Sequence, residues 1–194
     1  MFCDASEFPF TADLEANWKT VRGELERLPK GSFRAWPDRH LYERPAQQEE
    51  GKGWDVFGLY AFGYPLKRNC TLCPETTRLV ERIPSLKTAG FSWLEPGTHI
   101  KPHVGYTGAV LRCHLGLVIP PDCALRVGPE TRSWQEGKCM VFDDTTEHEA
   151  WNRSDRVRVV LLLDFAKPGA TFAPPMEAAI SLIFSQPDKE PRGR

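Results

Sequence analysis

Two histidines and one arginine stand at spacings that could build a metal site next to an anion-binding site. His103 and His148 are 45 residues apart, and each lies at the end of an apolar stretch. Imidazole binds iron, zinc or copper, so two strands of a closed β-fold could bring both rings to one metal ion. Arg158 follows ten residues after the second histidine and supplies a permanent positive charge. This layout predicts an iron site that binds a dicarboxylate, and it points to oxygenase chemistry.

The third ligand of the usual non-haem iron site is missing from this pattern. Such sites use two histidines and one carboxylate, and the carboxylate stands two residues after the first histidine. Gly105 occupies that position here and has no side chain to offer. For either histidine alone, an ordinary core or surface residue is the favoured interpretation. The spacing to Arg158 favours a shared site instead.

The elements that must position these residues are short strands. From residue 89 onward, short apolar runs are separated by turn signals such as Pro96-Gly97 and Gly128-Pro129. The predicted strands are Phe91–Leu94, Val110–Ile119, Ala124–Val127, Cys139–Phe142 and Val157–Phe165. Strands at this spacing predict a mainly β fold, an antiparallel sandwich or jelly roll, rather than an α/β sheet.

The first third of the chain predicts helices that flank this sheet structure. Leucine, tryptophan and valine recur at helical spacing over residues 12–28, with Thr11 as the expected N-cap. A strand over 54–60 and a short helix over 74–82 follow a polar loop at 37–53. A terminal helix is expected over 176–185.

These elements predict a single domain over residues 1–185. It consists of an N-terminal extension of helix and loop (1–53) and a β core (54–168), and residues 186–194 form a flexible tail. The formal net charge of −1 predicts no nucleic-acid partner. Because no long apolar run and no signal peptide are visible, we expect no stable membrane insertion and a cytoplasmic location.

The cysteines offer little chemistry. Six cysteines are too few for a disulfide scaffold in a chain of 194 residues. Cys70 and Cys73 form a single C-x-x-C motif, whereas a zinc ribbon needs two. We interpret them as two ordinary thiols near the start of a helix.

Several segments resemble the aspartyl/asparaginyl β-hydroxylase family. They are FSWLEPGTHIKPHVG at 91–105, LRCHLGLVIP at 111–120, FDD at 142–144 followed by HEAWN at 148–152, and the segment from Arg158 to Asp164. The similarity runs from about residue 54 to residue 168. It implies a double-stranded β-helix, a cupin-like jelly roll, that uses Fe(II), 2-oxoglutarate and O2 and forms succinate and CO2.

The resemblance also implies the metal ligands. His103 and His148 would bind Fe(II), and the glycine at 105 is the family's own departure from the usual pattern. Water can take the vacant coordination position. Asp144, four residues before His148, resembles a family acid that holds this water and thereby orients it.

Four further residues would hold the cosubstrate. By resemblance, Arg158 grips the distal carboxylate of 2-oxoglutarate with help from Ser92. Arg112 and His114 resemble the groups near the carboxylate that binds iron. These two share strand parity, so both can face one cavity. Asp164 could equally end the last strand through a turn hydrogen bond, so we assign it no role in the site.

The expected activity is hydroxylation of an unactivated C–H bond in a small-molecule or peptide substrate. The β-carbon of an Asp- or Asn-like amino acid, free, carrier-bound or in a peptide, is the first expectation. Val110 stands where the best-known members carry a second arginine, which weakens the case for an acidic side chain. The alternatives are a lipid acyl-chain hydroxylase, a non-catalytic jelly roll that holds a metal and binds a small acid, and a zinc hydrolase. The sequence does not indicate an oligomeric state.

Overall fold

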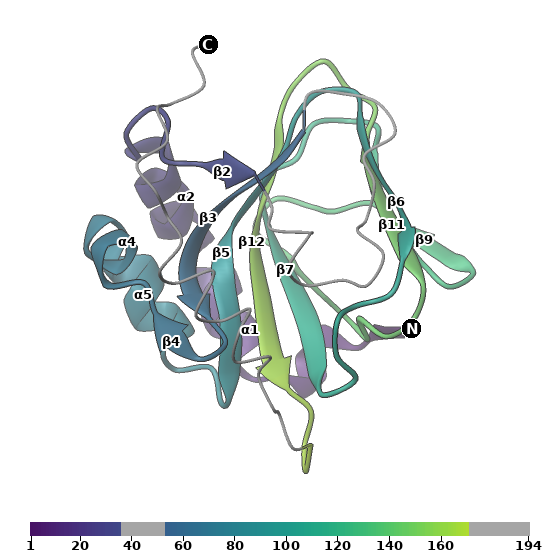
Figure 1. The fold of residues 1–194 in the computed structure, drawn as a ribbon, viewed down its shortest axis with the longest axis horizontal. Coiled ribbons are helices and arrows are strands. Elements are labelled where there is room, and N and C mark those ends of the chain that lie inside the picture. The colour runs from purple at the N-terminus through teal and green to yellow at the C-terminus, as the bar shows by residue number, and fades with distance from the viewer. Residues whose placement is uncertain (36–52, 171–194) are drawn as a thin grey trace.

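Two antiparallel sheets face each other in the computed structural model, which describes residues 1–35 and 53–170 (Figure 1). In these residues the larger sheet has eight strands in the order β1-β10-β7-β12-β5-β3-β2, with β4 paired to β3, and the smaller sheet has the order β6-β11-β8-β9. The strands are β1 (Phe2–Cys3), β2 (Arg34–Ala35), β3 (Trp54–Ala61), β4 (Tyr64–Pro65), β5 (Leu86–Leu94), β6 (Thr98–His103), β7 (Val110–Val118), β8 (Cys123–Val127), β9 (Glu130–Arg132), β10 (Cys139–Phe142), β11 (His148–Asn152) and β12 (Arg158–Ala166).

The chain passes between the two sheets as in a jelly roll. From β5 onward, β5, β7, β10 and β12 lie in the larger sheet, and β6, β8, β9 and β11 lie in the smaller one. The partners of β12 are β5 and β7, and the partners of β11 are β6 and β8. This arrangement confirms the mainly β, double-stranded β-helix fold with helices near the N-terminus.

The larger sheet is buried on both faces. In β12, Val160 and Leu162 face an inner core between the two sheets, whereas Leu161 and Leu163 face an outer core. Successive side chains of a strand point to opposite faces, so a strand covered on both sides needs an unbroken apolar run. This explains the segment Val-Val-Leu-Leu-Leu over 159–163.

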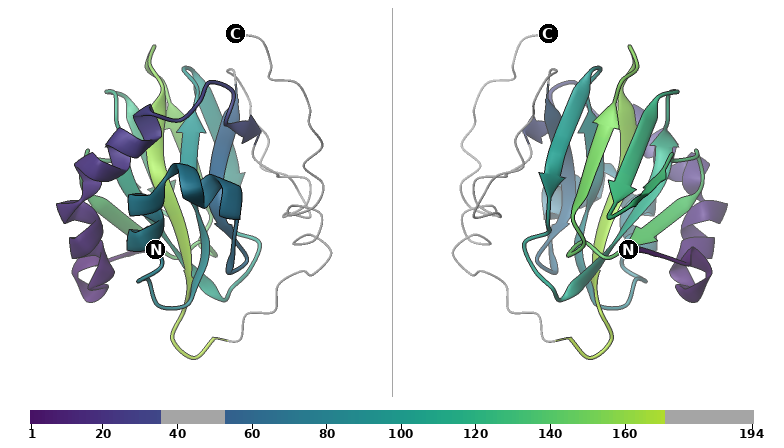
Figure 2. Two further views of the ribbon diagram at one scale, coloured as in Figure 1. Left: turned by 90° about the vertical axis from the view of Figure 1, so that its left-hand side faces the viewer. Right: turned by 90° about the vertical axis from the view of Figure 1, so that its right-hand side faces the viewer.

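The helices cover the outer face of the larger sheet, as both views of Figure 2 show. They are the 3-10 helix η1 (Ala5–Glu7) and the α-helices α1 (Phe10–Ala16), α2 (Trp18–Glu26), α4 (Lys67–Leu72) and α5 (Pro74–Val80). The prediction of one helix over 12–28 was wrong, because Asn17 leaves the helical conformation at φ −108° and ψ 9°. Thr11 lies inside α1 and donates its hydroxyl to Ala5 O and Phe8 O instead of capping a helix.

The other predicted elements are found with small shifts. The strands predicted from apolar runs correspond to β3, β5, β7, β8, β10 and β12, and the helix predicted over 74–82 corresponds to α5. The sequence did not predict β6 and β11, the two strands that carry His103 and His148, and it did not predict α4. Almost all of the 37–53 loop, the helix over 176–185 and the tail lie outside the described residues. The domain limits stay predictions.

Two further expectations concern thiols and membranes. All six cysteines are free, with Cys70 in α4 and Cys73 directly before α5. Burial raises the pKa of both thiols, that of Cys73 to about 12, so neither is an activated thiolate. Within residues 1–35 and 53–170, no helix is both long and apolar enough to span a bilayer.

Candidate active site

The two histidines meet at the end of the smaller sheet. His103 ends β6 and His148 begins β11, and the two residues are cross-strand partners. Their ring centroids lie 4.2 Å apart. His148 is buried and His103 is partly buried. Two imidazoles from distant parts of the sequence therefore lie close enough to bind one ion.

Backbone carbonyls fix the protonation of both rings. Nδ1 of His103 lies 2.7 Å from Lys101 O, and Nδ1 of His148 lies 2.9 Å from Thr146 O. A carbonyl only accepts, so each Nδ1 carries the proton and each Nε2 presents a lone pair. Burial lowers the pKa of both histidines, and for His148 the neighbouring His103 and Arg112 add to this and bring the pKa to about 3. A neutral imidazole with an unprotonated Nε2 is the form of histidine that binds metals.

Asp144 lies against this pair and fills the space beside Gly105. Its Oδ1 is 3.3 Å from His148 Nε2. Because His148 is neutral at physiological pH, two acceptor atoms face each other there, a geometry that a cation between them would relieve. A Cβ on residue 105 would lie 1.8 Å from Asp144 Oδ2, and the Gly105 N–H donates to Asp144 O at 2.7 Å. The backbone approaches so closely that only glycine fits.

Arg112 is held by two buried aspartates. Its Nε donates to Asp164 Oδ1 at 2.7 Å and its Nη2 donates to Asp164 Oδ2 at 3.0 Å. Nη1 lies 2.9 Å from Asp144 Oδ1. Burial raises the pKa of Asp164 while Arg112 opposes that change. The two-pronged geometry is that of a guanidinium paired with a carboxylate.

Asp164 therefore does not end a strand through a turn. It lies inside β12 as the cross-strand partner of Arg112 in β7, and its exposed fraction is 1%. The alternative that Asp164 ends the last strand through a turn hydrogen bond is wrong. The expectation that Arg112 faces the iron-bound carboxylate stays a prediction, but the guanidinium is already engaged with two acids.

Arg158 is a buried cation of a different kind. It is 1% exposed, and among the described residues no carboxylate pairs with it and its Nε has no hydrogen-bond partner. Nη1 donates to Ser92 O at 3.3 Å and to Ser92 Oγ at 3.5 Å, and Trp54 Nε1 donates to the same hydroxyl at 3.0 Å. Burial lowers the pKa of Arg158 to about 10, so it stays charged at neutral pH. A buried guanidinium without an acid calls for an anionic ligand.

His114 lies between this cation and the histidine pair. Its Nδ1 accepts the Trp134 Nε1 proton at 3.3 Å, so its Nε2 carries a proton, and this nitrogen has no partner among the described residues. Burial, followed by the charge of Arg158, lowers the pKa of His114 well below its usual value. The Phe142 ring separates it from His148, at 5.3 Å from each. His114 is thus a fixed, neutral hydrogen-bond donor.

Trp134 closes the site on one side. Its ring centroid lies 4.6 Å from the Arg158 guanidinium carbon, and its indole N–H contacts His114.

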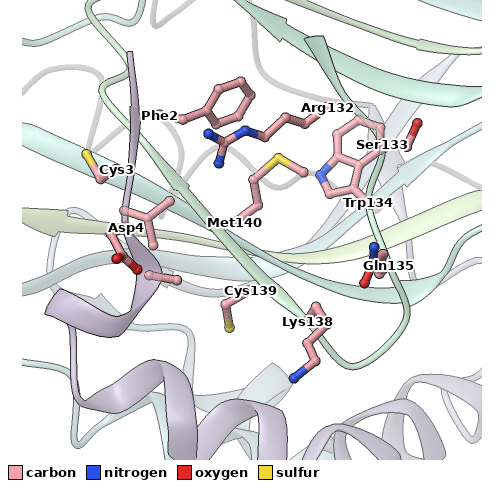
Figure 3. A pocket seen from close by; sticks show the side chains of 12 residues that line it. Phe2, Cys3, Asp4, Arg132, Ser133, Trp134, Gln135, Lys138, Cys139 and Met140 are labelled. Atoms are coloured by element: carbon pink, nitrogen blue, oxygen red, sulfur yellow. The ribbon is translucent and has the colours of Figure 1, made fainter. Parts of the chain in front are cut away.

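A cavity of about 450 Å³ lies beyond Trp134, between β1, β10 and the 132–138 segment (Figure 3). Two cations line it, but Lys138 pairs with Glu15 at 2.7 Å and Arg132 pairs with Glu130 at 2.7 Å. The cavity therefore offers no free positive charge for a second anion.

These residues fit a metal ion next to an organic acid. No group of three or more His, Cys, Asp or Glu side chains arranged for a metal occurs within residues 1–35 and 53–170. An ion at His103 and His148 would thus take two imidazoles and leave further positions for small molecules. The unpartnered donors of Arg158 and His114 match the carboxylates of a dianionic acid.

The structure brings together the residues that the sequence selected, through contacts the sequence did not reveal. His103, His148 and Asp144 form one cluster, and Ser92 and Arg158 form another, with His114 between them. Sequence reasoning missed the Trp134 side chain, which sets the proton position of His114 and stacks on Arg158. It also missed Trp54, which holds the Ser92 hydroxyl. Both could have been noticed only as tryptophans with an indole N–H in need of a buried acceptor.

Known proteins similar to this chain carry hydroxylase names. The chain is 40% identical over 170 residues to an ornithine lipid ester-linked acyl 2-hydroxylase from Rhizobium tropici, which covers 85% of this chain and 60% of that protein. It is 37% identical over 169 residues to the aspartyl/asparaginyl beta-hydroxylase of Homo sapiens, covering 81% of this chain and 21% of that protein. The chain thus spans less than two thirds of either relative. Among solved structures, a Cupin_2 domain of an XRE family transcriptional regulator from Enterobacter cloacae matches with a TM-score of 0.43 at 15% identity, covering 60% of this chain and 99% of that one.

The family comparison covers most of the site described above. Residues 15–168 match the family described as Aspartyl/Asparaginyl beta-hydroxylase, a segment that extends from α1 to just beyond β12. It contains both histidines and both buried arginines. The resemblance noted in the sequence is confirmed, and this chain belongs to the aspartyl/asparaginyl β-hydroxylase family.

Proposed function

We propose that this chain is an Fe(II)- and 2-oxoglutarate-dependent dioxygenase that hydroxylates an unactivated C–H bond. The observation that carries the proposal is Arg158, a buried guanidinium that has no acid partner among the described residues and lies in the same interior as two neutral, metal-competent imidazoles. A cation site and an anion site in one closed β-fold match the two charges of an iron–dicarboxylate pair. Membership in a family of hydroxylases supports the reaction class.

His103 and His148 would hold the iron through Nε2. Their Nδ1–H groups are fixed by Lys101 O and Thr146 O, so neither ring has to reorient when the ion binds. Asp144 would then accept a hydrogen bond from water on the ion, because its carboxylate lies on the His148 side and cannot be displaced toward residue 105.

Arg158 and Ser92 would hold the distal carboxylate of 2-oxoglutarate. The guanidinium supplies a planar fork and the serine hydroxyl adds a third polar contact. His114 would donate its Nε2 proton to the cosubstrate nearer the metal, since Trp134 occupies its other nitrogen. When bound, iron and 2-oxoglutarate would let O2 act as the oxidant, with one oxygen atom entering the hydroxylated product, the other entering succinate, and CO2 released. The protein holds both in a dry interior and excludes water.

The substrate has two candidates. The sequence favours the β-carbon of an Asp- or Asn-like residue. The Arg112 contacts argue against a substrate carboxylate at this position, because both aspartates that hold this guanidinium make it a poor partner for one. The relative from Rhizobium tropici, named as a lipid acyl hydroxylase, points to an ester-linked acyl chain instead.

The test is turnover of the cosubstrate. Purified protein is incubated with Fe(II), ascorbate, O2 and 2-oxoglutarate labelled at C1, first alone and then with an aspartyl peptide or an ester-linked acyl lipid. We expect release of labelled CO2 that stops in His103→Ala and increases with the true substrate. Binding of Fe(II) and 2-oxoglutarate without any CO2 release would instead favour the non-catalytic jelly roll. Hydrolysis of the peptide or the lipid in the presence of Zn(II) and without O2 would favour a zinc hydrolase.

A further inference from the structure

We propose that Asp164 is a positioning residue that orients the Asp144 carboxylate through Arg112 and thereby sets how tightly the site holds its metal ion. The inference rests on the proposed function, because it assumes an ion between His103 and His148. It assigns a role to a buried acid that the site as described above does not use.

The first link is the pairing of Asp164 with Arg112. The two are cross-strand partners in β12 and β7, and their exposed fractions are 1% and 2%. Both carboxylate oxygens of Asp164 accept from the guanidinium, at 2.7 and 3.0 Å. A guanidinium is planar, so two simultaneous bonds fix both its position and its rotation.

The second link is the remaining nitrogen of Arg112. Because Nε and Nη2 are committed to Asp164, the direction of Nη1 is fixed, and Nη1 lies 2.9 Å from Asp144 Oδ1. This same oxygen faces His148 Nε2 at 3.3 Å. On the other side, the Cα of Gly105 leaves Asp144 no room to turn away. The carboxylate is thus held between a fixed cation and a wall of backbone.

The third link is charge. Arg112, Asp144 and Asp164 form a buried group with one positive and two negative charges. Its excess negative charge lies beside two neutral imidazoles, where a divalent ion would compensate it. Replacing Asp164 with an amide would remove that excess and would leave Arg112 free to draw Asp144 toward itself. Both effects weaken metal binding.

Asp164→Asn tests the proposal through metal affinity rather than turnover. Free Mn(II) is measured by electron paramagnetic resonance during titration of the protein, which gives the dissociation constant without any reaction. We expect Mn(II) to bind about 10- to 100-fold more weakly than in the wild type, the range found for groups that orient metal ligands. The 2-oxoglutarate affinity at saturating Mn(II) should change by less than about threefold, because Arg158 and Ser92 still hold the distal carboxylate.

Glu24→Gln is the matched control. Glu24 in α2 is a buried carboxylate like Asp164, but it accepts the Thr76 N–H at 2.8 Å and the Glu75 N–H at 2.9 Å at the start of α5, on the outer face of the larger sheet. This variant should lose thermal stability and bind Mn(II) as the wild type does. It therefore separates the cost of a buried amide from the loss of orientation.

A second variant covers the case in which Asp164→Asn does not fold. The double variant Arg112→Gln/Asp164→Asn removes both charges and leaves two amides that can hydrogen-bond, so no unpaired buried cation remains. It keeps the net charge of the group at −1 but loses the guanidinium that orients Asp144, so it should bind Mn(II) more weakly than the wild type and no more weakly than Asp164→Asn. If the wild type binds Mn(II) and the folded variants bind it equally well, the role of Asp164 is overturned and the proposed function stands. If the wild type itself binds no Mn(II), both proposals fall.

Discussion

The Arg158 guanidinium lies in the interior with no carboxylate partner among the described residues, whereas the Arg112 guanidinium pairs with two aspartates. Both side chains are buried to the same extent, so burial alone does not distinguish a ligand-binding arginine from a structural one. The difference lies in whether the protein itself neutralises the charge. A neutralised arginine can orient its neighbours, and an unneutralised one can capture an anion.

Arg158→Ala should raise the 2-oxoglutarate requirement and leave metal binding in place. Loss of charge-assisted bonds worth about 1.5–3 kcal/mol corresponds to a KM for 2-oxoglutarate that is roughly 10- to 150-fold higher. The KM is measured from succinate formation at saturating Fe(II). Arg78→Ala is the control, because Arg78 lies on α5, on the outer face of the larger sheet, and pairs with Glu75 there. A KM equal to that of the wild type in Arg158→Ala would show that the anchor is misassigned.

The residue types of the site were predictable from sequence, but their pairings were not. His103, His148, Asp144 and Arg158 stood out by type and spacing. The partner of Arg112 did not, because Asp164 is 52 residues away and only the register of β7 and β12 brings them together. A single sequence contains no signal for such a register, since a shift of two residues would preserve every apolar position.

At the scale of elements, both strands that carry the histidines were among those that the sequence did not predict. β6 reads Thr-His-Ile-Lys-Pro-His and β11 reads His-Glu-Ala-Trp-Asn, with polar residues on the inner face. An active site in a jelly roll places polar groups where a pattern search expects apolar ones. The fully buried strands β7 and β12 have long apolar runs, and these were predicted.

The close contact between β7 and the 133–138 segment allows a test of whether Trp134 supports the proposed 2-oxoglutarate site. A Cβ on Gly116 would lie 2.1 Å from Gln135 O, so Gly116→Ala should push away the segment that carries Trp134. We expect the free energy of unfolding to fall by about 1–3 kcal/mol, as at other overpacked sites. We also expect a higher KM for 2-oxoglutarate. Chemical denaturation and succinate assays measure the two effects. Gly108→Ala, whose nearest contact would be 3.8 Å, should change neither. An unaltered KM in Gly116→Ala would mean that Trp134 does not support the cosubstrate site.

At the scale of the whole molecule, three histidines that stay neutral when folded make stability depend on pH. Burial is the main cause of the lowered pKa of His103, His114 and His148. In the unfolded chain a histidine titrates near pH 6.5, so below that pH the unfolded state binds protons that the folded state does not. The free energy of unfolding of the metal-free protein must therefore fall as the pH falls below about 6.5, and for His148 this continues to about pH 3.

Urea denaturation of chelator-treated protein between pH 7.5 and pH 5 measures this slope. Each neutral histidine contributes up to about 1.4 kcal/mol per pH unit. His114→Gln should remove about one such contribution, and the difference between wild type and variant isolates it from the carboxylates. Identical slopes in the two proteins would show that His114 is protonated in the folded state, which would exclude its role as a neutral donor.

The missing Cβ at Gly105 also limits which substitutions this protein could accept at its proposed metal site. A carboxylate at that position would give the three-ligand iron site of relatives outside the family, but any side chain there collides with Asp144. Moving Asp144 aside first would leave Arg112 and the ion without their shared acid. Conversion between the two coordination modes therefore calls for paired substitutions, because one single change creates a collision and the other removes the partner of Arg112. In this chain, steric crowding at residue 105 would therefore confine the proposed centre to two histidines, independently of which substrate it takes.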